Sequence, residues 1–117
     1  MKVDVCDRAV AFATRIVRLS GELEKDAGVS RSLCVQLWNS ATTLQANIED
    51  AQSAQGGADA VSKMKIALKE ACDIHYWLSV LVATGILPEE ELATLIHECA
   101  ETVSLIRASI AETREVA

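Results

Sequence analysis

The chain has 117 residues, of which half are hydrophobic and 3% aromatic, with only five glycines and one proline. This length suits one domain spanning residues 1–117, and so few turn residues beside abundant helix formers exclude a strand-rich fold. The formal net charge of −6 opposes sequence-independent binding to nucleic acid, which needs lysine and arginine to displace counterions.

The first predicted helix spans about residues 3–25, where apolar residues recur at steps of three and four. They are Val5, Ala9, Phe12, Ile16, Leu19 and Leu23. A second apolar stripe runs beside the first and consists of Val3, Cys6, Val10, Ala13 and Val17. Because this apolar face is wider than a two-helix contact requires, we expect part of it to meet another subunit.

The second predicted helix spans about residues 30–53, and Ser30 is its expected N-terminal cap. Its core-facing stripe consists of Leu33, Leu37, Ala41, Leu44 and Ile48. The spacing of these residues is again three to four, so one side of this helix is predicted to be buried.

The third predicted helix spans about residues 58–84, after the turn signal Gly56-Gly57. Asp59 is its expected cap, and Gly85 is expected to end it. Its predicted core stripe consists of Met64, Leu68, Ala71, Ile74, Leu78 and Leu81.

The fourth predicted helix spans about residues 88–115. Pro88 suits a first helical position, and the three glutamates that follow it suit the positive end of the helix dipole. Its apolar residues are Leu92, Leu95, Ile96, Cys99, Val103, Ile106 and Ile110. Short breaks between four long helices favour antiparallel neighbours, so the sequence predicts an all-α, up-down-up-down four-helix bundle.

The four cysteines stand far apart, with no Cys-x-x-Cys pair, and resemble neither a zinc site nor a secreted disulfide scaffold. We therefore expect a reducing, cytoplasmic environment. Charges interrupt the first eight residues, and the longest apolar segment, residues 76–87, is too short to span a bilayer. We expect neither a signal peptide nor a membrane span.

Several stretches resemble a known family. The most specific is the run from Asp59 through Ile66-Ala67-Leu68-Lys69-Glu70-Ala71, followed by Tyr76-Trp77-Leu78 and Gly85-Ile86-Leu87. A weaker match is Gln45-Ala46-Asn47-Ile48-Glu49-Asp50. These segments are similar to the four-helix bundle proteins encoded in intervening sequences of bacterial 23S ribosomal RNA genes. Departures from the family pattern occur at Ala51, Cys72, Ile74 and His75.

The resemblance implies an up-down bundle that often assembles as a homopentameric ring and has no established enzymatic activity or cofactor. One related branch, the accessory variability determinant of diversity-generating retroelements, is a basic barrel that binds nucleic acid and a reverse transcriptase. Fold alone does not transfer that role, and this chain is acidic where that branch is basic.

Cys72, His75, His97 and Cys99 are the only residues that suggest a soft-metal site. His97 and Cys99, however, point about 200° apart on an ideal helix and cannot both face one ion. We expect no bound metal, with the cysteines as small buried hydrophobes and the histidines at the bundle rim. The sequence also lacks the Glu-x-x-His pairs of di-iron bundles and a phosphate-binding loop.

Two basic strips offer an alternative function as a nucleic-acid contact. Arg8, Arg15 and Arg18 share one side of the first helix, and Lys65 and Lys69 share one side of the third. The competing interpretation is a solvated face of ion pairs four residues apart, such as Asp4 with Arg8 and Arg18 with Glu22. We favour the paired face.

Asn47 and Asp50 stand near the end of the second helix, beside a core residue. They suit either a polar contact with a partner or a local cap, and the sequence leaves both interpretations open.

Adjacent Tyr76 and Trp77 cannot share one helix face, because neighbouring residues differ by about 100° in direction. At least one ring must lie at the bundle edge, and such residues are enriched at association surfaces. We place Tyr76 and Trp77, together with Val10 and Phe12 of the first helix, at a contact between subunits. The sequence thus favours a non-enzymatic, self-assembling bundle over a nucleic-acid-binding accessory protein.

Overall fold

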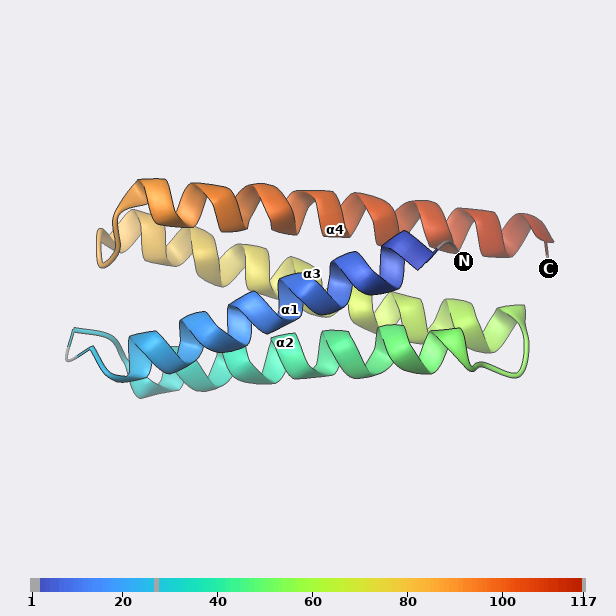
Figure 1. Cartoon of the computed structure of the whole chain (residues 1–117), viewed down its shortest axis with the longest axis horizontal. Coiled ribbons are helices and arrows are strands. Elements are labelled where there is room, and N and C mark those ends of the chain that lie inside the picture. Colours follow the sequence, from blue (N-terminus) through green and yellow to red (C-terminus); the bar gives the residue numbers. More distant parts are fainter. Residues whose placement is uncertain (1–2, 27, 117) are drawn as a thin grey trace.

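The computed structural model describes residues 3–26 and 28–116, with side chains from Val5 to Glu115 outside that gap, and it contains four α-helices in this part of the chain (Figure 1). They are α1 (Val3–Glu24), α2 (Arg31–Gln52), α3 (Gly57–Thr84) and α4 (Glu89–Val116). Each boundary lies within one residue of the boundary expected from sequence. None of the described helices is long and apolar enough to cross a membrane.

Local signals set the helix ends. The Ser30 hydroxyl accepts a hydrogen bond of 3.1 Å from the backbone N–H of Ser32, so the predicted cap of α2 is confirmed. Gly85 ends α3 with φ of 68°, a left-handed conformation that glycine adopts without steric penalty. The predicted cap of α3 was wrong: Gly56 holds that position, and Asp59 lies in the first turn, where its charge suits the helix dipole.

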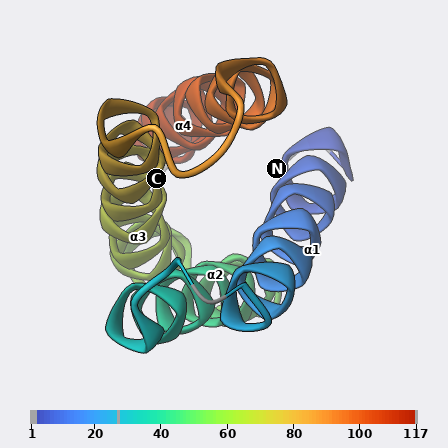
Figure 2. The same ribbon diagram turned by 90° about the vertical axis from the view of Figure 1, so that its left-hand side faces the viewer.

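The helices form an antiparallel up-down-up-down bundle, as expected. Viewed along the bundle, α1 to α4 follow one another around a central core, with α1 and α4 farther apart than the other neighbours (Figure 2). One cluster of buried side chains runs between all four helices. Its largest fully buried members are Phe12, Ile16, Leu23, Leu37, Leu44, Ile48, Met64, Ile74, Leu78, Leu81, Leu92 and Ile106.

The core register of α3 differs from the prediction at one position. Ala67 is fully buried, whereas Leu68 is only half-buried at the edge of the core. Here α3 and α4 approach closely, since the Cys99 thiol lies 3.2 Å from the carbonyl oxygen of Ala71. Ala67 stands four residues before Ala71 and seven before Ile74, both fully buried, so it shares their face of the helix, whereas Leu68 points about 100° further round. Leu33 is likewise half-buried, and Cys34 takes the core position.

Leu37→Asp should unfold the subunit. Leu37 is fully buried, and an unpaired carboxylate there costs several kcal/mol against a domain stability of about 5–15 kcal/mol. Thermal denaturation followed by circular dichroism measures the effect. Gln36→Asp is the matched control, because Gln36 is exposed beside Leu37 and the same change there should leave the melting transition nearly intact. A cooperative transition near that of the wild type in Leu37→Asp would contradict the assigned core.

Candidate functional site

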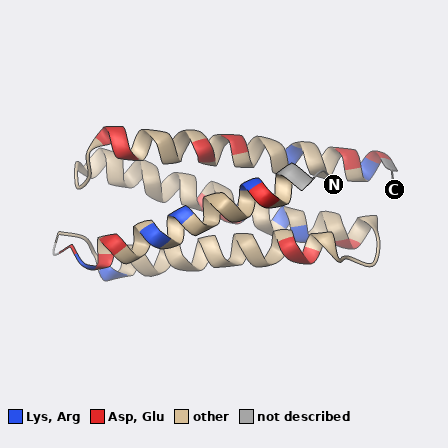
Figure 3. Cartoon of the chain, viewed as in Figure 1, with Lys and Arg blue, Asp and Glu red and all other residues tan. Residues whose placement is uncertain are grey.

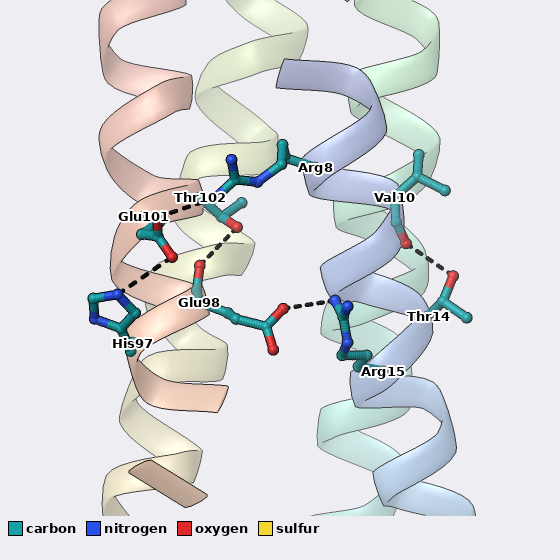
Figure 4. A network of polar contacts seen from close by, with 8 residues as sticks. All are labelled: Arg8, Val10, Thr14, Arg15, His97, Glu98, Glu101 and Thr102. Atoms are coloured by element: carbon teal, nitrogen blue, oxygen red, sulfur yellow. Dashed lines mark hydrogen bonds and ion pairs between the residues drawn. The ribbon is translucent and has the colours of Figure 1, made fainter. Parts of the chain in front are cut away.

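Two ion pairs cross the seam between α1 and α4. Arg8 donates to Glu101 at 3.1 Å, and Arg15 donates to Glu98 at 2.6 Å (Figure 4). His97 Nε2 lies 3.4 Å from the other carboxylate oxygen of Glu101. These pairs are largely exposed, so each contributes roughly 0.2–1 kcal/mol to stability. Their main effect is to join two helices that pack less closely than the others.

Most of the predicted basic strip of α1 lies at this seam and has acidic residues beside it. Arg8 and Arg15 pair with α4, across helices, and not with residues of their own helix. The side chain of Asp4, the expected partner of Arg8, lies outside the described residues. Arg18 lies in an open pocket of about 200 Å³ between α1 and α4, which is also lined by Glu22 and Glu91. Basic residues of α1 therefore lie beside acidic residues of α1 and α4 on this side of the molecule (Figure 3).

Of the two lysines predicted to contact nucleic acid on α3, one already has an acidic partner. Lys69 donates to Asp73 one helical turn away at 2.7 Å, and this hydrogen bond raises the lysine's pKa. Lys65 is exposed. The predicted nucleic-acid residues are thus spread over two helices, and three of the five already have an acidic partner.

Asn47 and Asp50 make no side-chain hydrogen bond to another helix among the described residues. The side-chain amide of Asn47 donates a hydrogen bond of 2.9 Å to the carbonyl oxygen of Thr43, within α2. Asp50 is exposed, and its backbone carbonyl accepts from Ser53 where α2 ends. The hydrogen bond of the Asn47 side chain is therefore local, as in the second interpretation. It lies inside α2, however, and does not cap the end of the helix.

The cysteines and histidines do not gather in one place. Cys34 and Cys99 are buried, Cys6 is half-buried, and all four cysteines are free thiols. The expectation that every cysteine is buried was wrong for Cys72, which is exposed because it follows core residue Ala71 by one helical step. Both histidines are exposed. Over residues 3–26 and 28–116, no three potential ligands among Cys, His, Asp and Glu are grouped to hold a metal ion.

The most conspicuous apolar surface of α3 is formed by Tyr76 and Trp77. Tyr76 is 61% exposed, and its ring meets that of half-buried Trp77 edge to face, with 5.1 Å between ring centroids. Residues 74–88 contain no Asp, Glu, Lys or Arg. Interface centres are depleted of charge and enriched in tyrosine and tryptophan, so this surface has the composition of a contact site.

The predicted contribution of α1 to that contact is corrected in part. Phe12 is only 1% exposed and belongs to the core of its own subunit, because its position in the main stripe directs it inward. Val10 is half-buried, as are Cys6 and Val17 of the second stripe. Ala13 of that stripe is fully buried, while the side chain of Val3 lies outside the described residues.

Sequence reasoning missed a second exposed apolar group. Val35 is 45% exposed and Trp38 is 50% exposed on α2, and Ile66 of α3 is 41% exposed. The signal was present in the sequence. Val35 and Trp38 each follow a core residue by one position, and the angular argument used for the Tyr76-Trp77 pair also places them outside the core.

The geometry thus defines an antiparallel all-α bundle with charged pairs on one seam and exposed aromatic rings on other faces. The profile of the family described as 23S rRNA-intervening sequence protein matches residues 1–108, and the chain belongs to this family.

The chain is also similar to a crystal structure of a protein of unknown function from the S23 ribosomal protein family of Bacteroides thetaiotaomicron. The two share 34% identity over 91% of this chain and 97% of the other, with a TM-score of 0.85. No curated protein matches significantly.

Thiol labelling should separate Cys72 from Cys99. Burial, and secondarily the charge of Cys72, raises the pKa of Cys99 to about 12, and the reactive species is the thiolate. Near pH 8, Cys99 should therefore react slowly in the folded protein, while exposed Cys72 reacts first. Reaction with a chromogenic disulfide measures both rates. Cys72→Ser should abolish the fast phase, whereas a fast phase that survives this change would contradict the assigned exposure.

Proposed function

We propose that this protein is a non-enzymatic bundle that works by self-assembly in the bacterial cytoplasm, as a homo-oligomer and, following the family resemblance, as a homopentameric ring. The observation that carries the proposal is the exposed Tyr76 ring, which stacks edge to face on Trp77 in an uncharged part of α3. A subunit alone leaves this apolar surface in water. Burial against a neighbour gains roughly 25 cal/mol per Å² of apolar area.

The chemistry of the titratable groups supports a role without catalysis. The acids and bases at the α1–α4 seam are exposed and paired with each other. Burial raises the pKa of Cys99, of Cys34 and of Cys6, so these thiols are held in their less nucleophilic form. Free thiols also suit a reducing compartment.

The alternative, a nucleic-acid-binding accessory protein of the retroelement type, has less support. Its five basic residues would have to contact phosphate, but Arg8, Arg15 and Lys69 already pair with carboxylates. Assembly would also multiply a net charge of −6 per subunit, which repels phosphate within a Debye length of about 8 Å. No observation in the described part of the chain favours this function over self-association.

Replacing Tyr76 and Trp77 together by alanine should lower the mass of the assembly while the helices persist. Tyr76 is largely exposed, so the subunit core loses mainly the buried part of the Trp77 ring. Light scattering reports the mass and circular dichroism the helix content of the same sample. Thr94→Ala, on an exposed position of α4, is the control and should change neither. An unchanged mass in the double variant, or a monomeric wild type, would contradict the proposal.

A further inference from the structure

A second uncharged surface lies on α2. Residues 32–48 contain no Asp, Glu, Lys or Arg, although 24% of the chain is charged. The stretch covers about 25 Å of helix, and Figure 3 shows α2 without charge between its coloured ends. Its exposed residues are Ser32, Val35, Gln36, Trp38, Asn39, Thr42 and Ala46. A half-exposed tryptophan at the centre of an uncharged helix face is typical of a surface that another protein covers.

The aromatic residues of the two uncharged surfaces lie at similar heights along the bundle. α2 ends and α3 begins at the same end of the molecule (Figure 1). At 1.5 Å per residue, Val35 and Trp38 lie about 26 and 21 Å from the end of α2, and Tyr76 and Trp77 lie about 28 and 30 Å from the start of α3. Two copies placed side by side with their axes parallel would therefore bring these surfaces together with a shift of only about 6 Å along the axis.

The two surfaces lie on neighbouring faces of the bundle. On α2, Val35 stands two residues before the core residue Leu37, about 200° around the helix, and so points away from the core. On α3, Tyr76 lies two residues from each of the core residues Ile74 and Leu78, about 200° around the helix, and so points directly away from the core. α2 and α3 are neighbours in the bundle, so the two surfaces face outward on adjacent sides of it (Figure 2).

We infer that the Val35–Trp38 surface of one copy receives the Tyr76–Trp77 surface of the next, in a head-to-tail contact with parallel axes. This inference rests on the proposed self-assembly and names both halves of its interface. A head-to-tail contact between neighbouring faces turns each copy relative to the last and closes a ring if the rotation fits. A symmetric contact through one surface alone would leave the other aromatic group in water.

The charge distribution identifies the occupant as a second copy of this chain. Each subunit has a net charge of −6, so two copies repel each other wherever their acidic residues meet. The uncharged stretches of α2 and α3 are where such copies approach with least repulsion. A basic partner would instead be attracted to acidic positions, such as the three consecutive glutamates at the start of α4.

The test uses two variants that each disable one surface, Trp38→Glu and Tyr76→Glu. Both side chains are at least half exposed, so both variants should keep the helix content of the wild type. Light scattering should show each variant alone as a single subunit of 12.6 kDa. Mixed in equal amounts, the variants should form a dimer of twice that mass, because each pair retains one intact Trp38 surface and one intact Tyr76 surface.

The outcomes separate the inference from the proposal beneath it. If Trp38→Glu alone keeps the mass of a wild-type oligomer, the contact does not use α2 and the head-to-tail inference is wrong, while self-assembly stands. Two monomeric variants that fail to associate on mixing also overturn it. A wild type that is itself monomeric overturns the proposed function. If Trp38→Glu loses helix content, Val35→Glu replaces it as the variant that disables the α2 surface. Thr94→Glu, on an exposed position of α4, is the control and should keep the mass of the wild type.

Discussion

Each helix of this bundle can turn only one narrow stripe of side chains inward, and the remaining structure depends on that constraint. The stripes meet in a core that contains one aromatic ring, Phe12, and many alanines, including Ala9, Ala41, Ala67 and Ala71. Small residues let the helices approach closely, as the contact between Cys99 and the Ala71 carbonyl shows. Such a core has no room for large rings at positions adjacent to the stripe, so Trp38 and Tyr76 remain at the surface.

The same constraint separates charge from apolar surface. The α1–α4 seam carries acidic and basic partners that face each other, as in the Arg15–Glu98 pair. Exposed apolar rings lie instead on α2 and α3, in stretches without charged residues. A chain with a net charge of −6 stays apart from other acidic molecules over most of its surface and offers copies of itself a limited area for contact. Self-association is therefore the function that this arrangement supports best.

Periodicity predicted the four helices and their boundaries because spacings of three and four, together with Ser30 and Gly85, act locally. Periodicity placed Leu68 in the core stripe instead of Ala67, because hydrophobicity favours leucine inside, whereas the face that α3 shares with Ala71 and Ile74 buries Ala67. The angular argument found Tyr76, but it was not applied to Trp38, which obeys the same geometry. Arg8 and Arg15 pair with α4 because α1 and α4 lie side by side in the bundle. No local sequence pattern specifies which helices become neighbours.

The mass of the wild-type protein in solution tests the central claim most directly. Light scattering on the full chain, over a range of concentrations at low and at roughly 1 M salt, where charge is screened within about 3 Å, is the measurement. Self-assembly through uncharged surfaces predicts a mass several times 12.6 kDa that persists or grows as salt screens the repulsion between acidic subunits. A mass of 12.6 kDa at all concentrations, or an oligomer that salt dissociates, would contradict the account.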